Sequence, residues 1–427
     1  MRRRNALYYT AIGIGTALSG CLSRDGDGSA SESEPRERAS AVDSSPEPES
    51  EWRSWPAGTA IETVEDVRTE DIDENWGVTG TAATGSQSIY YAGSTNGSVA
   101  FDYADDPLDL TESGMALIVK AKDYSTGASP FVELEDGDGN RWRFRQRVSA
   151  AADGWIRIDL AIDDPAVDGV EPDLSAIETI RLRPSPSSNE SGRPRLYFDS
   201  LWRTPSFDTA KVVLQFDDGH ETQYTEAFPI LSSYGWSATT YVTTDWIGND
   251  DRCDLDQLEE LQDDGWIVGN HTVTHPNLRG LSVEEVEAEV EGAREWLIEH
   301  GFQEGANHFA YPENGYSRDA IDVVREHHQT GRVSSLSYPV VFPTNPQLVS
   351  GDGDPESSRV ERIVDRTIEH GGIYAPYWHR LTGETVDDFR NSMEYIRARE
   401  RDGDLEVIRM DELHRQLGGD GSTATRG

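Results

Sequence analysis

Lysine is scarce in this chain of 427 residues, which contains only Lys120, Lys122 and Lys211. All basic residues together number 38 against 79 acidic ones, so the formal net charge is −41. Because binding to nucleic-acid phosphates needs clustered positive charge, this balance argues against a nucleic-acid partner. The 36% of hydrophobic residues and 11 Trp suffice for a folded core, which argues against general disorder. We therefore expect an acidic surface that stays hydrated in high salt, as in a halophilic protein.

Long apolar runs are also rare. The run 6–18 follows three arginines and is too short to span a bilayer as a mature helix. These features predict an export signal of the twin-arginine kind over residues 1–21. Residues 18–21 (Leu-Ser-Gly-Cys) resemble a lipobox, whose cysteine becomes the lipidated N-terminus. We therefore expect an exported protein that Cys21 anchors by lipid alone to the outer face of the cytoplasmic membrane. The alternative is a leader that ends in an incidental cysteine.

Cysteine occurs only twice. Once Cys21 is lipidated, Cys253 has no partner for an intrachain disulfide, and we expect it to be buried rather than reactive. Residues 22–51 are rich in Ser, Glu, Asp, Gly and Pro and almost lack apolar side chains. Such a segment cannot bury enough surface to offset chain entropy, which predicts a disordered acidic tether. A disordered tail is expected at 416–427.

Residues 52–205 have the pattern of an all-β domain. Short segments with alternating apolar residues predict strands at 116–119, 131–134, 141–144 and 155–160, separated by turn residues such as those at 135–140. A β-sandwich is the expected architecture. The end of this region, 173–199, resembles the last strands of jelly-roll carbohydrate-binding modules, which implies sugar binding. The alternative is that the aromatic residues serve only as core.

From residue 208 to 415 the pattern changes to alternating strands and helices. Strands are expected at 211–216, 239–242, 266–269, 308–311, 372–375 and 405–408, and helices at 255–261, 283–297 and 386–396. This alternation predicts a parallel sheet that is either open or closed into a barrel.

Asp217 and Asp218 directly follow the first buried strand of this region. Active sites of parallel α/β folds lie at the carboxyl ends of strands. The same Asp-Asp-Gly triplet occurs at 263–265, where it ends an expected helix, so the triplet alone does not indicate an active site. The first copy differs because two carboxylates beside a buried strand cost free energy unless a cation or a function holds them.

His271 and His275 follow another expected strand. On a helical turn, two histidines four residues apart point the same way and can both reach one metal ion. The alternative is that they cap or hydrogen-bond a loop. With one aspartate, they would leave open positions on Zn²⁺, as catalytic sites do. Such a metal lowers the pKa of bound water and polarises a carbonyl group.

His379 comes after the apolar residues 373–375 and can act as a general acid, although a plain loop histidine is the alternative. The other histidines are expected to be bystanders, with only the first adjoining the site: His220, His300, His308, His327, His328, His370 and His414.

These motifs in this order resemble polysaccharide deacetylases, the NodB-homology family of metal-dependent carbohydrate esterases, over residues 208–415. The resemblance implies a distorted (β/α) barrel with fewer than eight complete units. It also implies that Asp217 is the general base, that His379 protonates the departing amine, and that Asp218, His271 and His275 hold the metal.

Two departures from the family pattern concern the residues that orient the general base and support the general acid. Residues 309–315 resemble the family's third motif, which implies a backbone N–H near Glu313 as an oxyanion donor. The family's arginine that orients the base is missing there, because Ala310 occupies its position. The fourth motif, which supports the acid histidine, is not identifiable around residues 337–346.

We therefore expect an exported hydrolase that removes N-acetyl or O-acetyl groups from a surface or extracellular polysaccharide. It would use water activated by one divalent metal, with Zn the first choice. One alternative is a non-catalytic glycan-binding surface protein that keeps the metal, which the missing arginine favours. Another is a hydrolase of a different amide bond on the same barrel. The sequence leaves the glycan and the oligomeric state open.

Overall fold

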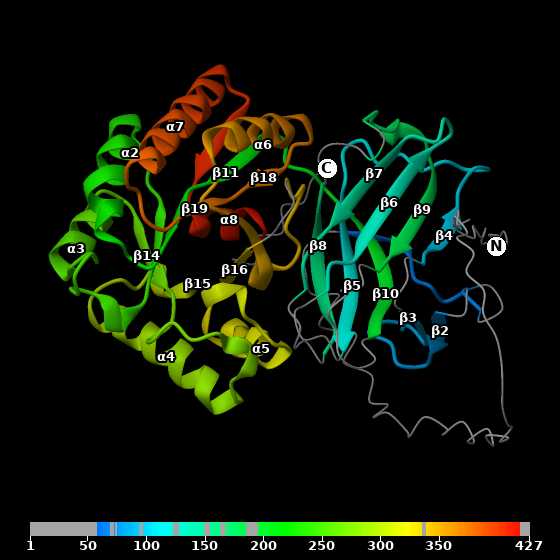
Figure 1. The fold of residues 1–427 in the computed structure, drawn as a ribbon, viewed down its shortest axis with the longest axis horizontal. Helices are drawn as coiled ribbons and strands as arrows, with labels where there is room; N and C mark the ends of the chain where they lie inside the picture. The colour runs from blue at the N-terminus through cyan, green and yellow to red at the C-terminus, as the bar shows by residue number, and fades with distance from the viewer. Residues whose placement is uncertain are drawn as a thin grey trace, which may run out of the picture.

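The computed structural model describes residues 58–418 except 69–71, 73–74, 94–96, 123–127, 149–153, 163–166, 168, 185–194 and 335–338. Within them, an antiparallel sheet is followed by a parallel barrel that helices surround (Figure 1). The predicted export signal, Cys21 and the tether 22–51 lie outside the described residues, as does the tail beyond residue 418. Among the described residues, no helix is long and apolar enough to cross a bilayer.

The N-terminal region forms a ten-stranded antiparallel sheet of order β2-β3-β10-β5-β8-β7-β6-β9-β4, with β1 paired to β10. The strands are β1 (Thr59–Glu62), β2 (Trp76–Thr79), β3 (Ser88–Tyr91), β4 (Val99–Asp102), β5 (Gly114–Lys122), β6 (Phe131–Asp136), β7 (Arg141–Arg145), β8 (Ile156–Ile162), β9 (Ile177–Arg183) and β10 (Arg195–Thr204). The four strands expected at 116–119, 131–134, 141–144 and 155–160 are confirmed as β5 to β8. The sandwich arrangement stays a prediction.

Alternation and turn chemistry explain these strands. In β7, Trp142 and Phe144 are buried while the arginines between them are half-buried, as alternation along a pleated strand requires. The turn between β6 and β7 is closed by Asp136, whose Oδ1 accepts the backbone N–H groups of Asp138 (3.0 Å) and Asn140 (2.9 Å).

The C-terminal region contains a closed barrel of seven parallel strands, which confirms a barrel rather than an open sheet. In order around it are β12 (Gln215–Asp217), β13 (Thr239–Val242), β14 (Ile267–Asn270), β15 (His308–Ala310), β16 (Thr330–Ser334), β17 (Val349–Gly353) and β19 (Pro376–Trp378). The sequence analysis did not predict β16, β17 or the separate β19. The first two have the sequences TGRVS and VSGDG, which are too polar and glycine-rich for a strand signal.

The expected strand 211–216 is two strands. Its first part, β11 (Ala210–Val213), pairs with β18 (Ile373–Tyr374) and β20 (Leu405–Ile408) in a small parallel sheet outside the barrel. Its second part, β12, pairs with β13 and β19. This division carries Asp217 into the barrel.

The helices are α2 (Phe228–Tyr234), α3 (Leu255–Asp263), α4 (Val283–Glu299), α5 (Arg318–His327), α6 (Ser357–Glu369), α7 (Glu384–Asp402) and α8 (Met410–Gln416). The three expected helices are confirmed as α3, α4 and α7. Helix α4 begins at a capping box in which the Ser282 hydroxyl and the Glu285 carboxylate each accept the other's backbone N–H.

The sheet packs directly against the barrel through β8. The Asp159 carboxylate is buried and accepts the backbone N–H groups of Thr344 (2.8 Å) and Asn345 (3.0 Å). Near the start of β8, the Arg318 guanidinium of α5 donates to the carbonyl of Trp155 (2.5 Å). Because α5 follows β15, this second contact lies toward the carboxyl end of the barrel strands.

Candidate active site

Asp217 and Asp218 lie at the carboxyl end of β12, as predicted. Asp217 ends the strand and is buried. Asp218 has a left-handed backbone with a φ of 69°, a conformation that aspartate tolerates better than most residues. The turn allows two consecutive carboxylates to meet different partners, which a base and a metal ligand require.

Arg332 of β16 is the partner of Asp217. Its Nη2 donates to Asp217 Oδ1, and its guanidinium lies over the ring of Tyr377, 3.8 Å from the centroid. Burial alone lowers the pKa of Arg332, but the charge of Asp217 outweighs it, so the pKa lies above its ordinary value. Ala310 of β15 is the register partner of Arg332. The arginine missing at Ala310 is therefore supplied by the next strand, which corrects the expectation that the base lacks one.

His379 follows β19 and is held by Asp354. Its Nδ1 donates to Asp354 Oδ2 (2.6 Å), and its backbone N–H donates to Asp354 Oδ1 (3.0 Å). Its Nε2 lies 3.9 Å from Asp217 Oδ2. Burial lowers the pKa of His379, but the hydrogen bond to Asp354 and the charge of Asp217 outweigh it and raise the pKa above its ordinary value. The carboxylate sought around 337–346 is thus Asp354, just after β17.

Asp218, His271 and His275 gather as predicted, with one candidate ligand atom from each within 4.8 Å of the others. Asp218 Oδ1 lies 3.7 Å from His271 Nε2 and 3.5 Å from His275 Nε2. Among the described residues this oxygen is buried with no hydrogen-bond donor. Burying such an oxygen costs free energy unless a cation compensates it. The three residues therefore fit a divalent metal ion.

The protonation of these side chains also suits a metal. His271 Nδ1 must carry the proton because it donates to the carbonyl of Ala310 (2.7 Å), which leaves the lone pair on Nε2. Burial lowers the pKa of His271 to about 4, so the imidazole is neutral near pH 7. Burial raises the pKa of Asp218, but the hydrogen bond with His220 and the nearby imidazoles outweigh it and hold the pKa well below its ordinary value.

The backbone of the histidine motif differs from the prediction. Residues 271–277 form a loop rather than a helical turn, and both Thr272 (φ 69°) and His275 (φ 65°) are left-handed. The loop is held by Glu289 of α4, whose carboxylate accepts the backbone N–H groups of Val273 (3.0 Å) and Thr274 (2.8 Å). The two histidines therefore converge through loop geometry and not through helical spacing.

Gln223 is a site residue that the sequence analysis missed. It begins a π-helical turn (Gln223–Ala227) and is fully buried. Its Nε2 donates to the carbonyls of Asp217 (2.6 Å) and His379 (3.2 Å), while its Oε1 accepts from Thr240 Oγ1 (2.7 Å). Gln223 therefore ties the backbone of the candidate base to that of the candidate acid. Nothing in the sequence marked it, because one glutamine in a polar segment carries no pattern.

Glu313 lies in the turn Pro312–Asn314 that follows β15, with a left-handed backbone (φ 53°). Its side chain accepts from Asn277 Nδ2 (3.1 Å), so the turn contacts the loop that carries the two histidines. The oxyanion role of its N–H stays a prediction.

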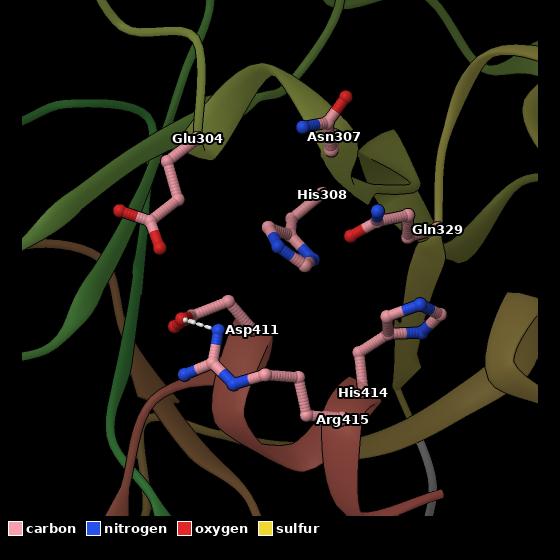
Figure 2. Close-up of a pocket in the computed structure, with 7 residues that line it drawn as sticks. All are labelled: Glu304, Asn307, His308, Gln329, Asp411, His414 and Arg415. Atoms are coloured by element: carbon pink, nitrogen blue, oxygen red, sulfur yellow. Dashed lines mark ion pairs between the residues drawn. The ribbon is translucent and has the colours of Figure 1, made fainter. Parts of the chain in front are cut away.

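Cys253 is buried, and burial raises its pKa to about 12, in agreement with the expected inert thiol. His220 adjoins the site as expected, with Nε2 3.6 Å from Asp218 Oδ2. His308 and His414 lie elsewhere, in a polar cavity of about 180 Å³ that Glu304, Asp411 and Arg415 also line (Figure 2). Because His308 begins β15, this cavity is at the amino end of the barrel strands.

The arrangement is typical of a metal-assisted hydrolase. Three candidate metal ligands, which would leave coordination positions open on the ion, lie beside a carboxylate that can act as a base and a histidine that can act as an acid. All of them lie at the carboxyl end of the barrel strands. Residues 205–331 match the family model "Polysaccharide deacetylase". Over these residues the chain is similar to polysaccharide deacetylases, hydrolases that act on the carbon–nitrogen bonds of acetyl groups. The match ends one residue before Arg332, so the roles of Arg332 and Asp354 rest on the geometry alone, and that of His379 rests on the geometry and the motif resemblance.

Two curated relatives agree with this match. The Bacillus subtilis protein YxkH is 27% identical over 110 residues, which cover 26% of this chain and 39% of YxkH. A chitooligosaccharide deacetylase from Azorhizobium caulinodans is 28% identical over 163 residues, which cover 38% of this chain and 69% of the relative. A solved structure of a family 4 carbohydrate esterase from Streptomyces lividans, in complex with acetate, is 15% identical to this chain and has a TM-score of 0.36. The similarity covers 46% of this chain and 91% of the esterase chain. This chain spans less than half the length of YxkH.

Proposed function

We propose that this protein is a metal-dependent hydrolase that removes N-acetyl or O-acetyl groups from a surface or extracellular polysaccharide. The observation that carries the proposal is the position of Asp217, which lies 4.0 Å from a metal-ligating nitrogen of His271 and 3.9 Å from the acid nitrogen of His379. The proposed base therefore lies beside both a candidate metal ligand and the proposed acid.

Asp217 serves as the general base. Its Oδ1 is occupied by Arg332, while its Oδ2 faces the ligand and acid histidines. That free oxygen takes the proton of the attacking water. Arg332 stays charged and fixes the orientation of the carboxylate.

His379 serves as the general acid. The Asp354 carboxylate accepts a hydrogen bond from Nδ1–H, so Nε2 is the nitrogen that exchanges a proton with the substrate. Since the pKa of His379 is raised, the ring holds a proton to give to the departing amine or alcohol.

Asp218, His271 and His275 hold the divalent metal, for which we propose Zn. When bound, it supplies Lewis acidity that polarises the acetyl carbonyl and acidifies water. The backbone N–H of Glu313 is the proposed second donor to the oxyanion.

The pairing of Arg332 with Asp217 removes the reason that favoured a non-catalytic glycan-binding protein, namely the missing arginine. Hydrolysis of a different amide bond, such as a cyclic imide, would use the same residues. An export signal, a Cys21 anchor and a tether are predicted from the sequence, and an exported protein would meet a polysaccharide rather than a small cytosolic amide, which supports the proposal.

Acetate release tests the proposal. The purified protein in high salt with Zn²⁺ would be assayed on acetylated chitooligomers, with Asp217→Asn as the matched variant. We expect release that the variant loses by about 10²- to 10⁴-fold, the range for removal of a general base. Equal release by both proteins would contradict the assignment of Asp217.

A further inference from the structure

The two carboxylate oxygens of Asp218 face different groups. Oδ1 lies 3.5 Å from His275 Nε2 and 3.7 Å from His271 Nε2, and among the described residues it has no hydrogen-bond donor. Oδ2 lies 3.6 Å from His220 Nε2 and 3.7 Å from Arg252 Nη1. The guanidinium of Arg252 stays charged at any physiological pH. The Asp218 side chain therefore has one oxygen on the side of the candidate metal ligands and the other beside a permanent cation.

The backbone and the side chain of Arg252 both fix its position. Segment 251–253, in the loop after β13, pairs antiparallel with segment 219–221, in the turn after β12, through two backbone hydrogen bonds of 2.8 and 3.0 Å. This pairing sets Arg252 opposite His220. The Nη1 of Arg252 also donates to the backbone carbonyl of Asp218 (2.9 Å). The guanidinium is thus held at the turn that carries Asp218 by contacts that do not depend on a metal ion.

Trp246 contacts both Arg252 and a candidate metal ligand. The Arg252 guanidinium lies over its indole ring, 4.5 Å from the centroid. The imidazole of His275 lies with its centroid 5.0 Å from that ring. Such cation–π and ring contacts restrict the rotamers of both partners. The half-buried Trp246 therefore supports Arg252 in its position beside the carboxylate of Asp218.

We propose that Arg252 is a positioning residue that keeps Asp218 a metal ligand through Oδ1 alone. Because the guanidinium pairs with Oδ2, that oxygen does not turn toward the metal. Asp218, His271 and His275 then supply three donor atoms and leave the other coordination positions open to water and to the acetyl carbonyl. The inference rests on the proposed function and deepens it, since it names the residue that keeps the metal site open.

The charge of Arg252 gives the proposal a distinctive sign. A guanidinium beside the ligand carboxylate repels a cation bound to that carboxylate, so its presence lowers the metal affinity. A residue that served only to hold the loop would act in the opposite direction, because its loss would leave a ligand poorly oriented and weaken metal binding. The two roles therefore predict opposite changes in metal affinity when Arg252 is replaced.

The test uses the full chain and two metal ions as probes. Competition with a chromophoric chelator gives the Zn²⁺ dissociation constant, and the visible absorption of the Co²⁺ form reports the coordination geometry. The variants are Arg252→Ala and the conservative Arg252→Lys. Arg390→Ala, which removes the same charge from an exposed ion pair of α7, is the matched control. Acetate release is measured at saturating metal, and thermal unfolding reports whether each protein folds.

We expect Arg252→Ala to bind Zn²⁺ about threefold to tenfold more tightly, because a positive charge near the ion is lost. Its Co²⁺ absorption should weaken, since this absorption falls as the coordination number rises and Oδ2 becomes a further ligand. Its kcat should fall about 10- to 100-fold, the range for loss of a group that orients a metal ligand. Arg252→Lys and Arg390→Ala should resemble the wild type in all three measurements.

Weaker or unchanged Zn²⁺ binding by Arg252→Ala, or an unchanged Co²⁺ spectrum, would overturn the proposal, as would an unchanged kcat. If the wild type releases acetate and Arg252→Ala gives one of these results, this inference fails and the proposed function stands. If Arg252→Ala shows the tighter binding and the altered spectrum but the wild type cleaves no acetylated glycan, the proposed function fails instead. A wild-type protein that binds no Zn²⁺ would overturn both.

Discussion

Asp217 is the residue on which the candidate site depends, because its two oxygens serve different partners. Oδ1 is bound by Arg332, and Oδ2 faces His271 and His379. A buried carboxylate in this position is stabilised only while the guanidinium remains. The role of Asp217 as the base can therefore be tested by substituting its partners as well as Asp217 itself.

Arg332→Ala should lower stability by about 3–5 kcal/mol, the cost of breaking one side of a buried ion pair, and should abolish most acetate release. Because Ala310 is the register partner of Arg332 on the neighbouring strand, Ala310→Arg in the same protein should restore part of both. Thermal unfolding and acetate release measure the two effects. No recovery in the double variant would contradict the view that Arg332 on β16 takes the role of the arginine that the family pattern has at position 310 on β15.

Asp354→Asn should change the pH dependence of kcat. The wild-type pKa of His379 is raised, so the acid keeps its proton until the pH rises through that value. Removing the Asp354 charge lowers the pKa of His379, so the alkaline limb of the pH profile should move to lower pH. A limb that stays in place would show that His379 is not the acid.

The partners of the base and acid were hidden in the sequence for physical reasons. Arg332 meets Asp217 only because of the parallel register of β15 and β16, which no local pattern encodes. Asp354 is one of 79 acidic residues and follows a glycine-rich strand, so its residue type alone did not indicate a functional role. The candidate ligands Asp218, His271 and His275 were predicted because the aspartate and the two histidines, which are four residues apart, each follow an expected buried strand.

At the scale of elements, the π-helical turn Gln223–Ala227 connects three strands of the barrel. Gln223 bonds to the ends of β12 and β19 and to Thr240 of β13. π-Helical turns are often found at functional sites. This turn keeps the base and the acid at a fixed separation.

Gln223→Leu should destabilise the protein by about 1–3 kcal/mol, because it leaves two buried carbonyls without a donor. It should also lower kcat more than it raises KM, since the substrate is not touched. Thr240→Val, which removes only the bond to Gln223 Oε1, is the milder control. An unchanged kcat in Gln223→Leu would contradict a positioning role.

Periodicity identified some elements of each kind but did not identify helices α5 and α6. Helices α3, α4 and α7 and strands β5 to β8 have clear amphipathic or alternating patterns. The split of residues 211–216 into β11 and β12 follows from tertiary pairing, because both halves are equally apolar. Closure of the barrel likewise depends on the short strand β19, which has only three residues.

At the scale of the whole molecule, the sheet and the barrel form one packed body in the described part of the chain. Hydrophobic residues of the sheet and of the barrel helices belong to one continuous cluster. The halophilic surface inferred from the net charge of −41 stays a prediction.

The proposed anchor is tested at this scale. Cys21→Ser should move the protein from the detergent phase to the aqueous phase in detergent partitioning, because no lipid is then attached. Equal partitioning of the wild type and the variant would contradict the lipid anchor at Cys21.

The most direct test of the central claim measures metal content and acetate release on one preparation. The protein would be stripped with a chelator, titrated with Zn²⁺ and assayed on acetylated chitooligomers, beside His271→Ala and His275→Ala. We predict one metal ion per chain, acetate release that rises with metal occupancy, and variants that neither retain the ion nor release acetate. Acetate release from the metal-free protein, or variants that still hold one ion per chain, would contradict the account.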